Sequence, residues 1–295
     1  MIEKRSVSRV IFNICNYGFM IGLCVICIAP LWHVLMASIS DPRMLMANSG
    51  ILWKPAGNIT FEGYKLVFRN DFILKGYVNT LFYVTTSTLL GTMLTVLAGF
   101  VLSRQTMLRT PFTIFVIFTM MFSGGLIPSY MVNRSLGLVN NMLSVIIPGV
   151  INAFYIIIMK NAFEQLSSSY EESAKLDGAS SLRIMVSILM PLVKSTIAVV
   201  AMFTIVMQWN AWYPASIYLP KRRDLWPLQL IMREILVQND VSKVLTAGDA
   251  VKKADMVGNL VKYCITIVGT LPILCAYPFA QKYFVTGVTL GGVKG

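Results

Sequence analysis

The sequence predicts an all-α membrane protein with six transmembrane helices and one short polar helix between the fourth and the fifth. Three observations support this prediction. Of the 295 residues, 56% are hydrophobic and only 13% are charged, whereas soluble domains carry about 25% charged residues. Apolar runs that reach the length of a transmembrane helix, about 20 residues, recur along the chain. A charged stretch, "YEESAKLDGAS" (170–180), interrupts them.

The apolar runs define a single transmembrane domain over residues 10–295. The first run follows the basic N-terminus "MIEKRSVSR" and is much longer than the roughly 7–15 apolar residues of a signal peptide. We therefore interpret it as a retained span, preceded by a cytoplasmic N-terminus at residues 1–9. The six predicted spans cover residues 10–37, 77–103, 111–132, 139–163, 184–212 and 256–284.

Glycine and proline interrupt four of the six runs. Proline removes a backbone hydrogen bond from a helix and kinks it. The breaks are compatible with ordinary transmembrane packing, where both residues are frequent, and also with hinges in a protein that opens to both sides of the membrane. The interrupting residues are Gly124, Gly125 and Pro128 in the third run, Pro148 in the fourth, Pro191 in the fifth, and Pro272 and Pro278 in the sixth.

Charge excludes some functions but does not by itself orient the chain. The net charge of +12 fits basic residues that flank spans and contact anionic lipid, and no basic stretch interleaved with aromatic residues suits a nucleic acid. Lys and Arg divide almost evenly between the two sides, although the single basic residue of the short loop 133–138, Arg134, weakly favours a cytoplasmic N-terminus. We expect membrane lipid as a partner and no nucleic acid.

Several kinds of functional site are missing from the sequence. None of the 13 Asp and Glu residues lies deep in a predicted span, whereas ion-coupled carriers usually need an intramembrane carboxylate. No GxxxxGK[ST] motif is present, so the chain does not bind ATP through a P-loop of its own. The single histidine, His33, has no neighbours in the sequence that would complete a metal site and is interpreted as interfacial. We expect neither an enzyme nor a metal site.

The charged interruption has the signals of a short, capped helix. Ser169 and Glu172 match the S-x-x-E capping box. Glu171 and Glu172 fall in the first turn, where the helix dipole favours negative charge. Gly178 suits the C-terminal cap. The sequence therefore predicts one polar helix that ends in a glycine turn.

The segment that follows the glycine turn leads into the fifth span. Within "ASSLR", Ser180 or Ser181 can cap the next helix. The polar helix itself is poor in apolar residues and small at its centre, at Ser173 and Ala174. Such a helix can lie flat on the membrane surface or dock in a groove of another protein, and its residues alone leave both open.

The stretch "ESAKLDGASSLRIMVSILMP" (172–191) resembles the EAA loop of binding-protein-dependent ABC importer permeases. The consensus of that loop is EAA, three residues, G, nine residues and I-x-L-P, and Ser173 and Met190 are mild departures from it. The segments at 122–141 and 209–236 are similar to permeases of the complex-polysaccharide, lipoprotein-linked type. The ending "QKYFVTGVTLGGVKG" is similar to the tail of the maltose-type second permease. The resemblance covers essentially the whole chain and points to the carbohydrate branch of the family.

The resemblance implies a transport subunit in a bacterial cell membrane. The expected partners are a dimer of a cytosolic ABC ATPase, a second homologous permease, an extracytoplasmic solute-binding protein and a saccharide, either an oligosaccharide or a polysaccharide fragment. ATP and Mg would bind to the ATPase, and this chain would hold no cofactor. Both termini and the coupling loop at 164–183 would be cytoplasmic, and the long loop at 213–255 would face outward.

The resemblance also assigns roles to residues of the polar helix. Glu172 would pair with the ATPase, Ala174 would permit close approach, and Gly178 would permit the turn. When ATP draws the ATPase subunits together, the coupling helices would move with them and the spans would change from inward-open to outward-open. The residues assigned to ATPase coupling are Glu171, Glu172, Ser173, Ala174, Asp177 and Gly178.

Three residues of the fifth predicted span are candidates for lining a substrate cavity. Lys194 lies well inside the apolar run and could either snorkel toward an interface or face water. Trp209 and Asn210 open the aromatic stretch "WNAWYPASIY" (209–218), which suits an interfacial belt or contact with a sugar. The alternatives to a sugar importer are an importer of the same class for another solute and, less well supported, an ion-coupled carrier.

Overall fold

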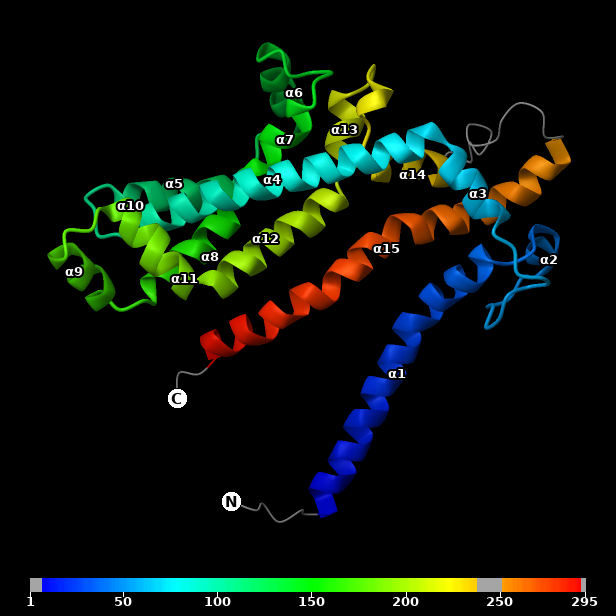
Figure 1. Ribbon diagram of the computed structural model, residues 1–295, viewed down its shortest axis with the longest axis horizontal. Helices are drawn as coiled ribbons and strands as arrows, with labels where there is room; N and C mark the ends of the chain where they lie inside the picture. Colours follow the sequence, from blue (N-terminus) through cyan, green and yellow to red (C-terminus); the bar gives the residue numbers. More distant parts are fainter. Residues whose placement is uncertain (1–6, 238–250, 293–295) are drawn as a thin grey trace. The chain divides into compact units, whose positions relative to one another are not determined.

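Figure 1 shows the computed structural model, which describes residues 7–237 and 251–292. Within these ranges every regular element is a helix. The chain forms two compact units. The first comprises Met1–Asn70 and Glu234–Thr270, and the second comprises Asp71–Arg233 and Leu271–Gly295. Most of the predicted N-terminal segment at 1–9 and part of the loop at 213–255 lie outside the described residues.

Among the described residues, the first unit contains three complete helices, the N-terminal part of α15 (Val251–Gly292) and the last residues of α14 (Leu228–Val237). The complete helices are α1 (Val7–Ser38), α2 (Pro42–Ala47) and α3 (Glu62–Arg69). A side chain at Gly63 of α3 would meet Cys264 Sγ of α15 at 2.6 Å. The Cys264 thiol donates to the carbonyl oxygen of Ser38 at 3.3 Å, so the end of α1 and α3 both pack closely against α15.

His33 is an integral part of the first unit. Its Nδ1 accepts a hydrogen bond from the backbone amide of Leu52 at 3.0 Å, and its ring meets that of Tyr263 edge to face at 5.7 Å. The half-buried imidazole therefore joins α1 to the segment after α2 and to α15. The interfacial interpretation, drawn from sequence position alone, omitted this structural role.

The second unit is organised around α4 (Asp71–Ser103), which packs against α7, α8 and α12. Figure 1 shows α9 and α10 beyond the end at which α4 finishes. The remaining elements of this unit are α5 (Arg109–Met121), α6 (Leu126–Ser135), α7 (Leu143–Val150), α8 (Ala153–Glu164), α9 (Ser169–Leu176), α10 (Ser181–Arg183), the π-helical η1 (Ile184–Leu189), α11 (Met190–Leu192), α12 (Lys194–Trp209), α13 (Tyr213–Tyr218), the 3-10 turn η2 (Arg223–Leu225) and α14 (Leu228–Val237), whose last residues belong to the first unit.

Small residues allow the helices of the second unit to approach α4 closely. A Cβ at Gly91 would lie 2.6 Å from the carbonyl oxygen of Val150, at the end of α7. A Cβ at Gly99 would lie 2.6 Å from Met159 Cβ and 3.0 Å from the backbone nitrogen of Lys160, both in α8. Close approach over small residues is a principal source of helix association in membranes.

Gly99→Ala is expected to destabilise the protein by about 1–3 kcal/mol, because the methyl group overpacks the contact between α4 and α8. The matched control is Gly22→Ala in α1, where a Cβ would meet nothing within 4 Å. Thermal unfolding in detergent would measure both variants. Equal midpoints for the two variants would contradict the close packing at Gly99.

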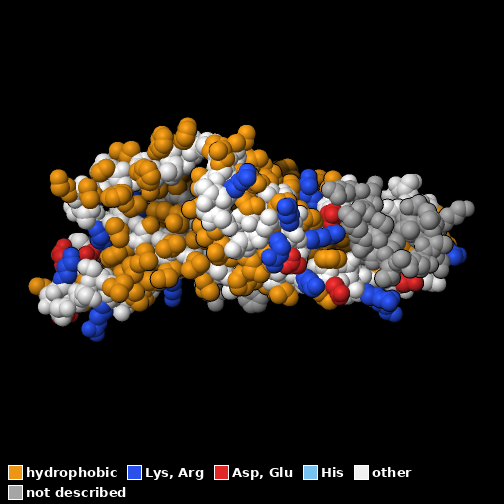
Figure 2. All heavy atoms as spheres, turned by 90° about the horizontal axis from the view of Figure 1, so that it is seen from above, with side chains coloured by type: hydrophobic (Ala, Val, Ile, Leu, Met, Phe, Trp, Pro, Cys, Tyr) orange, Lys and Arg blue, Asp and Glu red, His pale blue; other side chains and the backbone are white. Residues whose placement is uncertain are grey.

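Among the described residues, three helices are long and apolar enough to cross a membrane, and three bent helix pairs pass the same test as pairs. Each corresponds to one predicted run, so six spans result if every pair counts as one. Figure 2 shows the hydrophobic side chains that cover much of the visible surface, as lipid contact requires. The single helices are Val7–Ser38, Asp71–Ser103 and Val257–Pro278, and the pairs are α5 with α6, α7 with α8, and Ser181–Leu192 with α12.

The bends occur near the glycine and proline residues that interrupt the sequence. The α5–α6 pair bends by 115° at a break that contains Gly125, whose φ is +84°. The predicted run at 111–132 is thus a bent pair of helices that breaks where the sequence has Gly124 and Gly125. The α7–α8 pair bends by 43°, and the helix before α12 bends by 84° just after Pro191. The break before α12 makes Lys194 the first residue of that helix, so Lys194 lies at a bend in the span.

Candidate functional site

The charged helix predicted from the sequence is α9, but its N-terminal cap differs from the prediction. The N-cap is Ser168, which makes no side-chain capping hydrogen bond. The backbone amides of Glu171 and Glu172 each donate to the Ser168 carbonyl oxygen at 3.0 Å. The hydroxyl of Ser169 instead lies 2.8 Å from that of Ser167. The capping-box prediction is wrong because the helix begins one residue earlier than that pattern requires.

The C-terminal end of α9 agrees with the prediction in detail. Gly178 has a φ of +75°, which is the left-handed conformation that favours glycine. Its amide donates to the Lys175 carbonyl oxygen, and the Ala179 amide donates to that of Ala174, both at 3.0 Å. This pair of bonds is a Schellman motif. The Ser180 hydroxyl then accepts a hydrogen bond from the Arg183 amide at 3.4 Å, so Ser180 caps the next helix.

The coupling residues expected from the resemblance divide between two sides of α9. Glu172, Ser173, Asp177 and Gly178 are exposed. Ala174 is only 6% exposed and belongs to an apolar cluster with residues of α4, α8 and η1. Ala174 thus contacts the core of its own chain and not the exposed side on which its role was expected.

Glu171 also faces the body of the second unit. Its carboxylate forms an ion pair with Arg104, in the loop after α4, and its other oxygen lies 2.9 Å from the Lys175 ammonium. The Arg104 guanidinium lies 4.7 Å from the centre of the Phe100 ring. Burial lowers the pKa of Arg104, although the nearby Glu164 carboxylate opposes that shift. The ion pair and the contact of Arg104 with Phe100 thus hold α9 against the end of α4.

A second ion pair joins the start of α5 to α8. Arg109 pairs with Glu164, whose carboxylate also lies 2.9 Å from the Lys160 ammonium one helical turn earlier. The start of α5 is therefore joined to α8 through Arg109, and the loop before it is joined to α9 through Arg104. Neither arginine was singled out from the sequence, since each partner is more than 50 residues away in the chain, at separations of 55 and 67.

Two exposed apolar residues add to the outward side of α9. Leu176 is 89% exposed, and Tyr170, in the first turn, is 49% exposed. Together with Glu172, Ser173 and Asp177, they give α9 a surface that is both acidic and apolar.

The three cavity candidates do not form one site. Lys194 is exposed at the start of α12, whereas Trp209 and Asn210 lie at its end, about 24 Å away for a helix of this length. Trp209 is 5% exposed, and its ring lies 6.3 Å from that of Tyr77. The Asn210 side-chain amide donates to the Val206 carbonyl oxygen at 2.8 Å.

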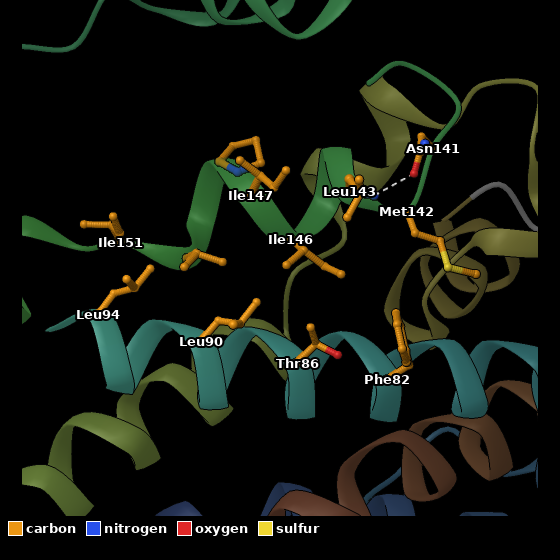
Figure 3. Close-up of a pocket in the computed structure, with 12 residues that line it drawn as sticks. Phe82, Thr86, Leu90, Leu94, Asn141, Met142, Leu143, Ile146, Ile147 and Ile151 are labelled. Atoms are coloured by element: carbon orange, nitrogen blue, oxygen red, sulfur yellow. Dashed lines mark hydrogen bonds between the residues drawn. The ribbon is translucent and has the colours of Figure 1, made fainter. Parts of the chain in front are cut away.

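The second unit contains an apolar cavity of about 620 Å³ between α4 and the segment that includes α7. Figure 3 shows Phe82, Thr86 and Leu90 on the side of α4 that faces α7. Thr86 and Asn141 are the polar residues among those that line it. None of the three cavity candidates lines this cavity, and its walls offer little for a polar solute.

Comparison with known proteins identifies the family. Residues 72–288 match the family described as "Binding-protein-dependent transport system inner membrane component". The chain is 35% identical to the polygalacturonan/rhamnogalacturonan transport system permease protein YtcP of Bacillus subtilis (strain 168), over 97% of this chain and 99% of the relative. It is 27% identical to the maltodextrin transport system permease protein MdxG of the same organism, over 99% of this chain and 100% of the relative.

A solved structure has the same fold. A chain of a bacterial ABC transporter involved in the import of the acidic polysaccharide alginate superposes with a TM-score of 0.85 and 27% identity, covering 96% of this chain and 99% of that one. The all-helical architecture and the resemblance found in the sequence are thereby confirmed. The chain belongs to the family of binding-protein-dependent transport system inner membrane components.

Proposed function

We propose that this chain is the transmembrane permease subunit of an ATP-driven importer of oligosaccharides or polysaccharide fragments. The observation that supports this most strongly is the 35% identity, over nearly the whole chain, to a permease named for polygalacturonan and rhamnogalacturonan transport. The likeness to a chain of an alginate importer points to the same class of solute.

The proposed role of α9 is to dock on a cytosolic ATPase. Its outward side offers Glu172, Ser173 and Asp177 together with the exposed Leu176. A short helix that presents such residues suits a groove with basic and apolar walls. Glu171 and Ala174 serve the same role from the other side, since they hold α9 against its own chain.

The complete importer would contain several other chains. An ATPase dimer would bind ATP and Mg and carry out hydrolysis, a second homologous permease would complete the pathway, and an extracytoplasmic binding protein would deliver the saccharide. Closure of the ATPase dimer would move α9 and convert the spans from inward-open to outward-open. In this arrangement both termini and α9 are cytoplasmic, and the long loop at 213–255 faces outward.

Uptake assays in cells that lack this chain test the proposal. Labelled oligogalacturonate and maltodextrin serve as probes, and the expected result is loss of uptake of at least one of them, restored by the intact gene. Unchanged uptake of both would overturn the saccharide assignment. Uptake that survives ATP depletion but collapses with the ion gradient would favour a carrier instead.

Lys194 does not line the apolar cavity between α4 and α7, but it remains the charged candidate for the solute pathway. We expect Lys194→Met to reduce saccharide uptake because it removes a hydrogen-bond donor from the start of α12, while leaving the amount of protein in the membrane unchanged. The matched control is Lys54→Met, an exposed lysine in the first unit. If both variants transport normally, Lys194 is interfacial and does not line the pathway.

A further inference from the structure

We propose that α4 transmits the movement of α9 to the loop at 219–228, with Arg104 as the positioning residue at the α9 end. All of these residues belong to the second unit. The inference rests on the proposed function of α9, and it adds a route by which a displacement at the ATPase surface reaches the opposite end of α4.

The first step of the route is the attachment of α9 to the end of α4. The Glu171 carboxylate, whose side chain is 15% exposed, pairs with Arg104, whose side chain is 25% exposed. Separating an ion pair that is largely shielded from water leaves two poorly solvated charges and is unfavourable. A displacement of α9 is therefore expected to carry Arg104 with it.

The second step is the attachment of Arg104 to α4 itself. Arg104 directly follows the last residue of α4, and its guanidinium lies over the Phe100 ring. Phe100 meets Phe163 edge to face at 5.8 Å, and both belong to the apolar cluster that also contains Ala174. The ionic contact and the apolar contact of α9 thus converge on the same end of the same helix.

The third step is the contact between the other end of α4 and the loop at 219–228. The Asn79 side-chain amide donates to the carbonyl oxygens of Asp224 at 2.8 Å and Trp226 at 3.0 Å. The Tyr83 hydroxyl donates to the Leu225 carbonyl oxygen at 2.8 Å.

A fourth hydrogen bond continues this contact. The Leu228 amide donates to the Thr80 hydroxyl at 2.8 Å, in a buried position. Buried hydrogen bonds are costly to break because their partners are left unsatisfied. Asn79, Thr80 and Tyr83 therefore hold the loop's backbone to α4 at several points, and the loop is expected to follow this end of the helix.

The helix between these two ends is suited to carry a displacement. α4 is one continuous helix without proline, and from Asn79 to Ser103 it spans about 36 Å. The three bent pairs change direction by 43°, 84° and 115°, and such breaks can absorb movement. A regular helix packed on several neighbours is a rigid element that links two distant sites.

A spin label at residue 221 can report movement of the loop. Lys221 is exposed, and its backbone amide donates to the Asn140 side chain at 3.1 Å. This hydrogen bond fixes the backbone that carries the label. The experiment uses Lys221→Cys in a chain whose five native cysteines are replaced, assembled with its ATPase and second permease. Spectra are compared without nucleotide and after trapping with ATP and vanadate.

The proposal predicts a spectral change on trapping that is largely lost in Arg104→Gln, although ATPase still co-purifies and hydrolyses ATP. The matched control is Arg109→Gln, which removes the neighbouring ion pair to α8 but does not contact α9, and it should keep the change. The swapped pair Arg104→Glu with Glu171→Arg should restore the change. Rescue by the swapped pair would show that the ion pair itself carries the change, and intact assembly and hydrolysis in Arg104→Gln would separate this role from a merely structural one.

The other outcomes decide either against the route through α4 or against the proposed function. A full spectral change in Arg104→Gln, or no change in the parent complex, would overturn the route through α4. If Arg104→Gln does not assemble, the swapped pair decides, and Tyr83→Phe, which breaks a contact at the other end of α4, should also weaken the change. Absence of any ATPase from the parent complex would instead contradict the proposed function.

Discussion

Glu172→Lys is expected to release the ATPase from the complex. Glu172 is exposed in the first turn of α9, where the helix dipole supports a negative charge. A lysine would oppose that dipole and face the basic groups that a carboxylate recognises. Removing one partner of a close interfacial charge pair costs about 3 kcal/mol, which corresponds to roughly 100-fold weaker docking. The ATPase recovered per tagged permease would be measured by quantitative mass spectrometry.

The control for this charge reversal is Glu62→Lys. Glu62 is also exposed and also lies in the first turn of a short helix, α3, but in the first unit. The Glu62→Lys variant should therefore leave ATPase recovery unchanged. Equal recovery with Glu172→Lys and Glu62→Lys would exclude Glu172 from the ATPase contact.

Gly178→Pro is expected to abolish ATP-dependent uptake while the spans still insert. Proline cannot adopt the φ of +75° found at this position, and it lacks the amide that donates to Lys175. Strain of this kind costs about 1–3 kcal/mol. The turn after α9 would rearrange, and α9 would lose its position relative to the ATPase. Uptake, ATP hydrolysis and the amount of protein in the membrane would be measured together.

Gly137→Pro provides the matched control for that turn. Gly137 has a φ of +69°, its amide donates to the Arg134 carbonyl oxygen at 3.0 Å, and it follows α6. The local damage should be similar, so both variants should lose comparable stability. Only Gly178→Pro should uncouple ATP hydrolysis from uptake. Normal uptake in Gly178→Pro would count against the coupling role of α9.

The spans were predictable because hydrophobicity is a property of the sequence itself. Every predicted run corresponds to a long apolar helix or to a bent pair, and all three bent pairs contain the glycine or proline residues noted in the sequence. The prediction of an interrupted sixth run was wrong, because Pro272 and Pro278 lie inside the continuous helix α15. The bend angles were not predictable, since they depend on how each half packs. For this reason the sequence did not show that Lys194 lies at a bend, where it is the first residue of α12.

The local features of α9 were predictable, but its attachment to the rest of the chain was not. The acidic first turn and the left-handed Gly178 follow from propensities of neighbouring residues. The capping box failed because the N-cap is Ser168 and the hydroxyl of Ser169 lies near that of Ser167 instead. The pair between Arg104 and Glu171 and the inward position of Ala174 depend on tertiary packing between distant segments, which no local pattern encodes.

Co-purification tests the central claim most directly. The chain would be tagged in its native host and extracted in mild detergent, and the proteins that accompany it would be identified by mass spectrometry. The account predicts an ABC ATPase and a second permease of the same family. A chain that arrives alone, or only with copies of itself, would contradict the proposed importer and leave the exposed acidic surface of α9 without a partner.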